Sequence, residues 1–259
     1  MIIKDVGFLI AFWGGFSSFF TLWQLCLMQI TPFFLAFAAG LYLLEDNSNS
    51  AARNPQSALV SLLLACAGYI LGFSIVFALM GTSGWGTASY ILYNIDDFRT
   101  AAAIYITIIA LLMALYNFYG SLASSLDKLR MNDDITLFDK PILFRILYLP
   151  AGLLLGASFA LAYSPCIPPV MSDIMNFAGK PNNALRGFQL LIVYGFGVTL
   201  AFSISGSALA ILAGYFTERR SVKVTIAYLS SGTLFLMAFL IFTDLMIRYK
   251  SFLVGLVLD

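Results

Sequence analysis

A long apolar segment with prolines in its second half occupies residues 143–177, which read LFRILYLPAGLLLGASFALAYSPCIPPVMSDIMNF. This segment is too long for one straight span, because about 20 residues at roughly 1.5 Å each already cross the ~30 Å hydrocarbon core. Pro165, Pro168 and Pro169 follow one another closely, and proline breaks the helical hydrogen-bond ladder. Non-helical backbone survives at membrane depth only where protein or a water-filled cavity surrounds it. The segment therefore predicts a broken helix beside an interior site.

The composition is that of a protein whose surface faces lipid. Of the 259 residues, 61% are hydrophobic and 10% are charged, and the mean hydropathy is +0.91. A soluble domain carries about 25% charged residues, so we expect an all-α integral membrane protein. The chain contains no histidine, which excludes haem or zinc held by imidazole. Its net charge of +1 gives no indication of nucleic-acid binding.

Apolar segments separated by short polar breaks run along the whole chain. They cover residues 7–44, 58–83, 100–122, 143–177, 187–216 and 222–247. No break is long enough to fold alone, so we expect a single transmembrane domain over residues 1–259 with six helices. The first segment, like the fourth, is too long for one straight span and contains Pro32. We therefore expect the first and fourth helices to be broken at prolines.

The two halves of the chain, about residues 1–125 and 140–259, resemble each other. Each has three apolar segments, and a stretch rich in glycine and aromatic residues recurs in the second segment of each, at 72–81 and 195–206. An odd number of spans per half places the halves in opposite orientations, so we expect two inverted three-helix repeats. Such repeats hold a site near the membrane midplane, between broken helices at equivalent positions.

The distribution of lysine and arginine indicates the orientation. If the N-terminus is outside, the cytoplasmic loops hold more of these residues than the outer loops do. Cytoplasmic loops of membrane proteins are enriched in Lys and Arg. We therefore expect a multi-pass protein of the plasma (inner) membrane with both termini extracytoplasmic.

The three cysteines differ in their surroundings. Cys66 has neither a proline nor a polar residue close by in sequence, and cysteine packs well as a small apolar residue. Cys26 and Cys166 each lie in a proline-broken segment, at the matching place of their halves. Inverted halves would bring this pair together near the two-fold axis, and a disulfide needs Cα atoms about 4.4–6.8 Å apart. Two thiols that form a disulfide and are reduced again carry two electrons. The alternative interpretation of Cys26 and Cys166 is that both only pack in the interior.

Other polar residues in the apolar segments have both a functional and a structural interpretation. Asp173 either tunes the Cys166 thiolate or takes its proton, or it marks the end of a span. Gln24, Gln29 and Thr31, which surround Cys26, either line a wet cavity or form hydrogen bonds between helices.

Two further patterns predict local structure. Asp244 is expected at the membrane interface with Arg248 as its (i, i+4) partner. Small residues four positions apart predict close helix packing; they are Gly68, Gly72, Gly152 and Gly156.

The cysteine motif at residues 164–170, Ser-Pro-Cys-Ile-Pro-Pro-Val, resembles the proline-flanked cysteine motif of the CcdA family and of the membrane domain of DsbD. Residues 72–81 resemble the second helix of that family, and residues 194–202 resemble the fifth. The size of CcdA, with six spans, covers essentially the whole chain. Around Cys26 the sequence departs from the family pattern, because Leu25 and Gln29 stand where the family has proline, and only Pro32 matches.

This resemblance implies a thiol-disulfide electron carrier of cytochrome c-type biogenesis or a related pathway. Such a carrier passes reducing equivalents from cytoplasmic thioredoxin to an extracytoplasmic thioredoxin-like protein. Cys26 and Cys166 fall where the family keeps its reactive pair. The implied chemistry requires no metal or organic cofactor, because sulfur carries both electrons.

Two other functions are compatible with the same sequence. A secondary transporter or exporter of a small solute or metal ion uses broken helices equally well, with Asp173, Gln29 and Thr31 as substrate ligands and the cysteines as packing residues or soft-metal ligands. A non-catalytic assembly subunit for a redox enzyme is the third. Cysteine dependence separates them, since only a dithiol carrier loses all activity on replacement of either Cys26 or Cys166.

Overall fold

The computed structural model describes residues 7–20, 31–48, 55–82, 86–127, 148–162, 169–216, 220–246, 248–249, 251–252 and 255. All regular structure in these ranges is helical, which confirms the all-α class. Stretches of four helices are long and apolar enough to cross a membrane: Leu59–Gly81, Ile95–Leu115, Ala184–Leu212 and Val224–Phe242. An integral membrane protein is the class that these helices define.

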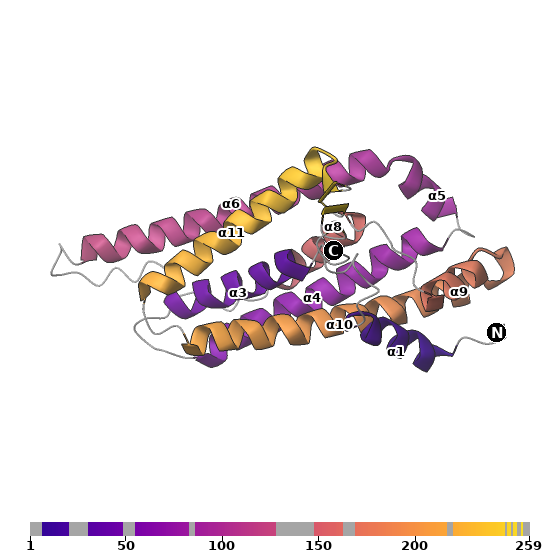
Figure 1. Cartoon of the computed structure of the whole chain (residues 1–259), viewed down its shortest axis with the longest axis horizontal. Coiled ribbons are helices and arrows are strands. Elements are labelled where there is room, and N and C mark those ends of the chain that lie inside the picture. The colour runs from indigo at the N-terminus through magenta and orange to yellow at the C-terminus, as the bar shows by residue number, and fades with distance from the viewer. Residues whose placement is uncertain are drawn as a thin grey trace.

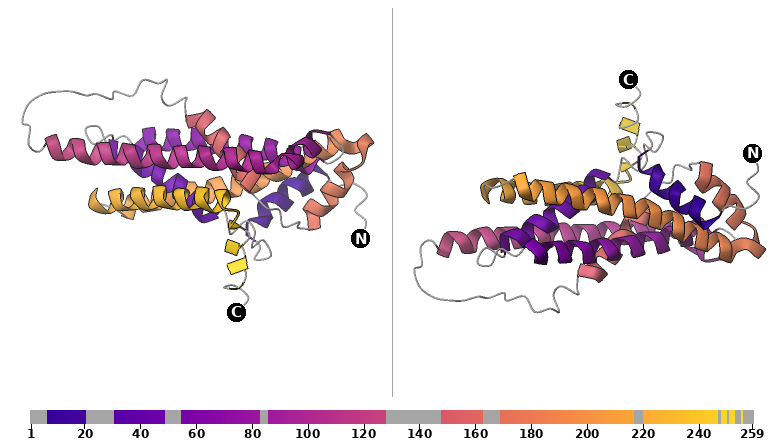
Figure 2. Two further views of the ribbon diagram at one scale, coloured as in Figure 1. Left: turned by 90° about the horizontal axis from the view of Figure 1, so that it is seen from above. Right: turned by 90° about the horizontal axis from the view of Figure 1, so that it is seen from below.

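The principal helices run along a common long axis (Figure 1; Figure 2). In chain order, the elements are α1 (Phe8–Ser18), α3 (Thr31–Ser48), α4 (Pro55–Gly81), α5 (Gly86–Tyr93), α6 (Ile95–Asp127), α8 (Tyr148–Ala162), α9 (Pro169–Ala178), the 3₁₀ turn η1 (Pro181–Asn183), α10 (Ala184–Phe216) and α11 (Arg220–Phe242). The apolar stretches of α6 and α11 pack side by side and expose many large hydrophobic side chains, as lipid-facing helices do.

The first and fourth apolar segments each contain two described helices. In the first segment, α1 packs against α10 and α9, whereas α3 packs against α11, α10 and α4. In the fourth, α8 packs against α4 and α6, whereas α9 packs against α10. Pro32 and Pro169 stand in the first turns of α3 and α9, where a missing N–H leaves no hydrogen bond unmade. These two prolines therefore start helices.

Glycines bring α4 and α8 into backbone contact. A Cβ atom added at Gly72 would overlap the carbonyl oxygen of Leu153, and one added at Gly156 would overlap that of Tyr69. Gly68 likewise meets Leu149, so the facing residue on α8 advances from Leu149 to Leu153 as α4 advances from Gly68 to Gly72, and the two helices run parallel. This confirms the close packing predicted from the small-residue pairs, because only glycine allows the backbones so near.

The pair α1 and α10 repeats the same contact. A Cβ atom added at Gly197 would overlap the carbonyl oxygen of Phe12, and one added at Gly15 would overlap that of Tyr194. On each of the four helices the two residues involved are three positions apart, so the two interfaces correspond residue by residue. Phe12 also meets Phe196 and Phe19 meets Phe202, so α1 and α10 run parallel too, and the first helix of each half packs on the second helix of the other half.

The core between these helices is aromatic. Phe34, Tyr69, Phe159 and Phe202 are almost fully buried. The Tyr69 ring centroid lies 4.5 Å from that of Phe34 and 5.6 Å from that of Phe159, and the Phe34 and Phe202 centroids lie 5.8 Å apart. This cluster joins α3, α4, α8 and α10, and such edge-to-face and tilted pairs add to the stability that burial provides.

The last apolar segment ends earlier than the sequence predicts. The helix α11 ends at Phe242, and Asp244 adopts a φ of 53°, in the left-handed region that stops a helix. Asp244 and Arg248 are both described, and no ion pair joins them. The expected (i, i+4) partnership is therefore wrong, because it requires a continuous helix from one residue to the other.

Candidate functional site

Both members of the predicted redox pair, Cys26 and Cys166, lie outside the described residues, as do Gln29, Pro165 and Pro168. The pairing of the two cysteines therefore stays a prediction. The described helix ends on either side of these segments define the surroundings of the candidate site.

The helices that lead into the two cysteine segments end at one core cluster. Phe19 follows the last residue of α1, and its ring centroid lies 4.9 Å from that of Phe202. Phe159 lies in the last turn of α8 and contacts Tyr69 of the same aromatic core. Cys26 and Cys166 each follow their phenylalanine by the same number of residues. Both helices therefore end at the same aromatic cluster.

A buried hydrogen bond fixes the end of α1 on α10. The Tyr194 hydroxyl donates to Ser18 Oγ over 3.3 Å, and the Ser18 hydroxyl donates to the Gly15 carbonyl over 2.6 Å. Buried hydroxyls are costly unless they are paired, so this chain of bonds favours one position of the α1 end. Neither Tyr194 nor Ser18 was singled out from sequence, because their contact depends on how α1 packs against α10.

The polar residues proposed to support the thiol pair lie at helix ends and surfaces. Asp173 is exposed on α9, which instead buries Met171, Ile174 and Ala178. Thr31 is half-buried at the start of α3, and Pro32 beside it is exposed. Thr31 is the first residue of α3, and Asp173 lies in the first half of α9. These are the helices that follow the two cysteine segments, so both residues lie within a few positions of those segments.

Cys66 lies in the core of the bundle on α4. Its side chain is buried, and its Sγ lies 3.9 Å from Ser207 Oγ on α10. Packing was the expected role of Cys66, and its polar neighbour Ser207 lies far from it in the chain. No group of three potential metal ligands of the His, Cys, Asp or Glu type occurs within the described ranges.

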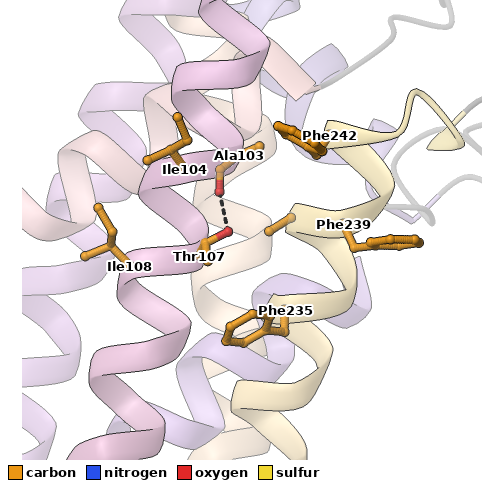
Figure 3. Close-up of a pocket in the computed structure, with 8 residues that line it drawn as sticks. Ala103, Ile104, Thr107, Ile108, Phe235, Phe239 and Phe242 are labelled. Carbon is orange, nitrogen blue, oxygen red and sulfur yellow. Dashed lines mark hydrogen bonds between the residues drawn. The ribbon is translucent and has the colours of Figure 1, made fainter.

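A surface groove lies between α6 and α11 and is wholly apolar in character (Figure 3). It is lined by Ala103, Ile104, Thr107, Ile108, Phe235, Ala238, Phe239 and Phe242. Its one hydroxyl, that of Thr107, donates to the Ala103 carbonyl over 2.8 Å, as the dashed line in Figure 3 shows. Such a lining suits the lipid-facing side of the bundle.

The helices, the split apolar segments and the cysteines define a multi-pass helical membrane protein with a candidate thiol site. Over 199 residues the chain is 25% identical to the cytochrome c-type biogenesis protein CcdA of Halalkalibacterium halodurans, a match that covers 76% of this chain and 74% of that protein. Over 48 residues it is 33% identical to a protein of Haemophilus influenzae named as a putative cytochrome c-type biogenesis protein. This second match covers 18% of this chain and 22% of that protein. No family model matches the chain, and no solved structure matches it. The chain is CcdA-like, as the cysteine motif predicts.

Proposed function

We propose that the protein is a transmembrane thiol-disulfide carrier that acts in cytochrome c-type biogenesis or a related pathway. The observation that carries the proposal is the similarity to CcdA over three quarters of the chain, in a protein with one cysteine in each of its two split apolar segments. The carrier takes reducing equivalents from cytoplasmic thioredoxin and passes them to an extracytoplasmic thioredoxin-like protein.

In the proposed reaction the Cys26–Cys166 disulfide accepts two electrons and later releases them. A thiolate of the cytoplasmic dithiol attacks one sulfur and forms a mixed disulfide, and the other thiol of the donor resolves it. The donor leaves oxidised, and Cys26 and Cys166 become thiols with two protons gained. The same pair then reduces an external disulfide by the reverse exchange, and its own disulfide re-forms.

Two inverted repeats provide the framework of the proposal. The corresponding contacts of α1 with α10 and of α8 with α4 support this arrangement, because a two-fold relation between halves generates such pairs of interfaces. With α1 and α3 counted as one crossing and α8 and α9 as another, the chain crosses the membrane six times, which puts both termini on the same side. The distribution of Lys and Arg favours the extracytoplasmic side of the plasma (inner) membrane. The prolines of the proposed site are Pro32 and Pro169, which start α3 and α9, and Pro165 and Pro168, which lie outside the described residues.

Thiol trapping in membranes tests the redox pair. A maleimide mass tag is applied before and after reduction to the wild type, to Cys26→Ser and to Cys166→Ser, with Cys66→Ser as the matched control. We expect Cys26 and Cys166 to resist labelling until reduced thioredoxin is added, and each single variant to free the other cysteine. Free labelling of both in the wild type, or no response to any reductant, would rule out the redox couple and favour transport through the same architecture.

A further inference from the structure

The helices α4 and α10 meet along a buried antiparallel interface (Figure 1). Gly81 of α4 faces Leu191 of α10, and Ser74 faces Gly195. At the other end, Cys66 faces Ser207. The residue numbers fall on one helix as they rise on the other, so the register places Ser203, one turn before Ser207, opposite Tyr69.

Polar side chains follow one another along this interface. We call this set the polar seam; it consists of Cys66, Tyr69, Ser74, Ser203 and Ser207. Tyr69 follows Cys66 by one turn on α4, and Ser203 precedes Ser207 by one turn on α10, so both lie next to the Cys66–Ser207 contact. Tyr69 is fully buried, and Ser74 and Ser203 are 3% and 7% exposed.

Three hydroxyls of the polar seam have no hydrogen-bond partner among the described residues. They are those of Tyr69, Ser74 and Ser203. Elsewhere in the bundle, hydroxyls bond to a carbonyl one turn back in their own helix, as Thr82, Thr199 and Ser231 do. Ser74 and Ser203 do not take this route, and the Tyr69 hydroxyl cannot, because a rigid ring holds it away from the backbone of α4. A buried polar group without a partner is costly, so these three hydroxyls have capacity for hydrogen bonds to a bound molecule.

We propose that the polar seam is a water-binding site, with ordered water between α4 and α10 bonded to Tyr69, Ser203 and the Cys66–Ser207 pair. Buried waters bind where two to four otherwise unsatisfied polar groups converge, and these side chains supply both donors and acceptors. The Cys66–Ser207 contact is at the long limit of a sulfur hydrogen bond, so both groups retain capacity for water. The site makes the interior between the two halves polar, and it does not depend on the role of Cys26 or Cys166.

The S–H stretching band of Cys66 reports on this water directly. Infrared difference spectra of the full chain in lipid, wild type minus Cys66→Ala, isolate the band, and transfer to D₂O follows its conversion to S–D. We expect the band to lie at the lower frequency of a hydrogen-bonded thiol and to exchange without unfolding. Tyr69→Phe and Ser203→Ala each remove one anchor of the water, so we expect either to shift the band and to slow its exchange about tenfold, the effect of one lost hydrogen bond.

Ser231→Ala is the matched control, since that serine is buried in α11 and its hydroxyl already bonds to the Tyr228 carbonyl. It should leave the band and its exchange unchanged. Ser203→Ala tests the site from the other helix if Tyr69→Phe does not fold. A band that never exchanges, or that Ser203→Ala and Ser231→Ala affect alike, overturns the proposal and shows a dry interface. Neither outcome affects the labelling of Cys26 and Cys166. The water-binding proposal can therefore be refuted while the redox pair stands, and the reverse.

Discussion

Replacement of Gly72 by alanine tests the packing of α4 on α8. The added methyl group would overlap the Leu153 carbonyl oxygen, and a backbone oxygen cannot rotate away as a flexible side chain can. To restore ordinary van der Waals contact the helices must separate by on the order of 1 Å, and a gap of that size forfeits roughly a quarter to a half of each dispersion contact along the interface. We expect Gly72→Ala to lower the free energy of unfolding by about 1–3 kcal/mol, the usual cost of overpacking.

Gly232→Ala is the control for this prediction. Gly232 lies within α11, and a Cβ atom added there would meet nothing within 4 Å. Alanine in a helix interior is favoured over glycine by roughly 0.5–1 kcal/mol, so Gly232→Ala should be neutral or stabilising. The two variants add the same methyl group and differ only in what it meets.

The assay is thermal unfolding in detergent, followed by maleimide labelling of Cys66 in a background that carries Cys26→Ser and Cys166→Ser. Cys66 is buried on α4, so it becomes reactive when the bundle opens. If Gly72→Ala unfolds at the same temperature as Gly232→Ala, the backbone contact between α4 and α8 is wrong. Gly197→Ala should cost a similar amount, because its methyl group would meet the Phe12 carbonyl in the corresponding interface.

Three further predictions concern the core and the α9 surface. Tyr194→Phe removes the hydroxyl that donates to Ser18 and should lower the free energy of unfolding by about 0.5–1.5 kcal/mol, which thermal unfolding measures; an unchanged midpoint would contradict that bond. Phe34→Ala empties the centre of the aromatic cluster and should cost about 3–5 kcal/mol, whereas Leu112→Ala, at an exposed lipid-facing position on α6, should have little effect in the same assay. Asp173→Asn should leave stability within about 0.5 kcal/mol because the side chain is exposed; a fall in the rate of disulfide transfer by that stable variant would assign Asp173 to the thiol chemistry, and an unchanged rate would make it the end of a span.

The amino-acid sequence by itself determined the class of protein and the approximate positions of its long apolar helices, whereas α5 lies in a stretch expected to be a polar break. Composition and apolar runs are local properties, and a lipid environment leaves the backbone little choice but helix. The fifth segment, expected at residues 187–216, corresponds to α10 at Ala184–Phe216. The glycine pairs predicted close packing, and the cysteine motif resembles that of the CcdA family. The expected end of the last segment was wrong, because the left-handed conformation of Asp244 has no clear signal in an apolar sequence.

Only the tertiary structure decided which helices meet and in what register. Cys66 and Ser207 are 141 positions apart in the chain, and nothing in the sequence near either one indicates the other. The Tyr194–Ser18 bond and the polar seam likewise depend on how whole helices are placed against each other. Helix formation follows from interactions within a few residues, whereas packing depends on the fit of complete helix surfaces and on where each buried polar group finds a partner. For that reason Cys66 looks like a simple packing residue in the sequence and lies within a polar site in the fold.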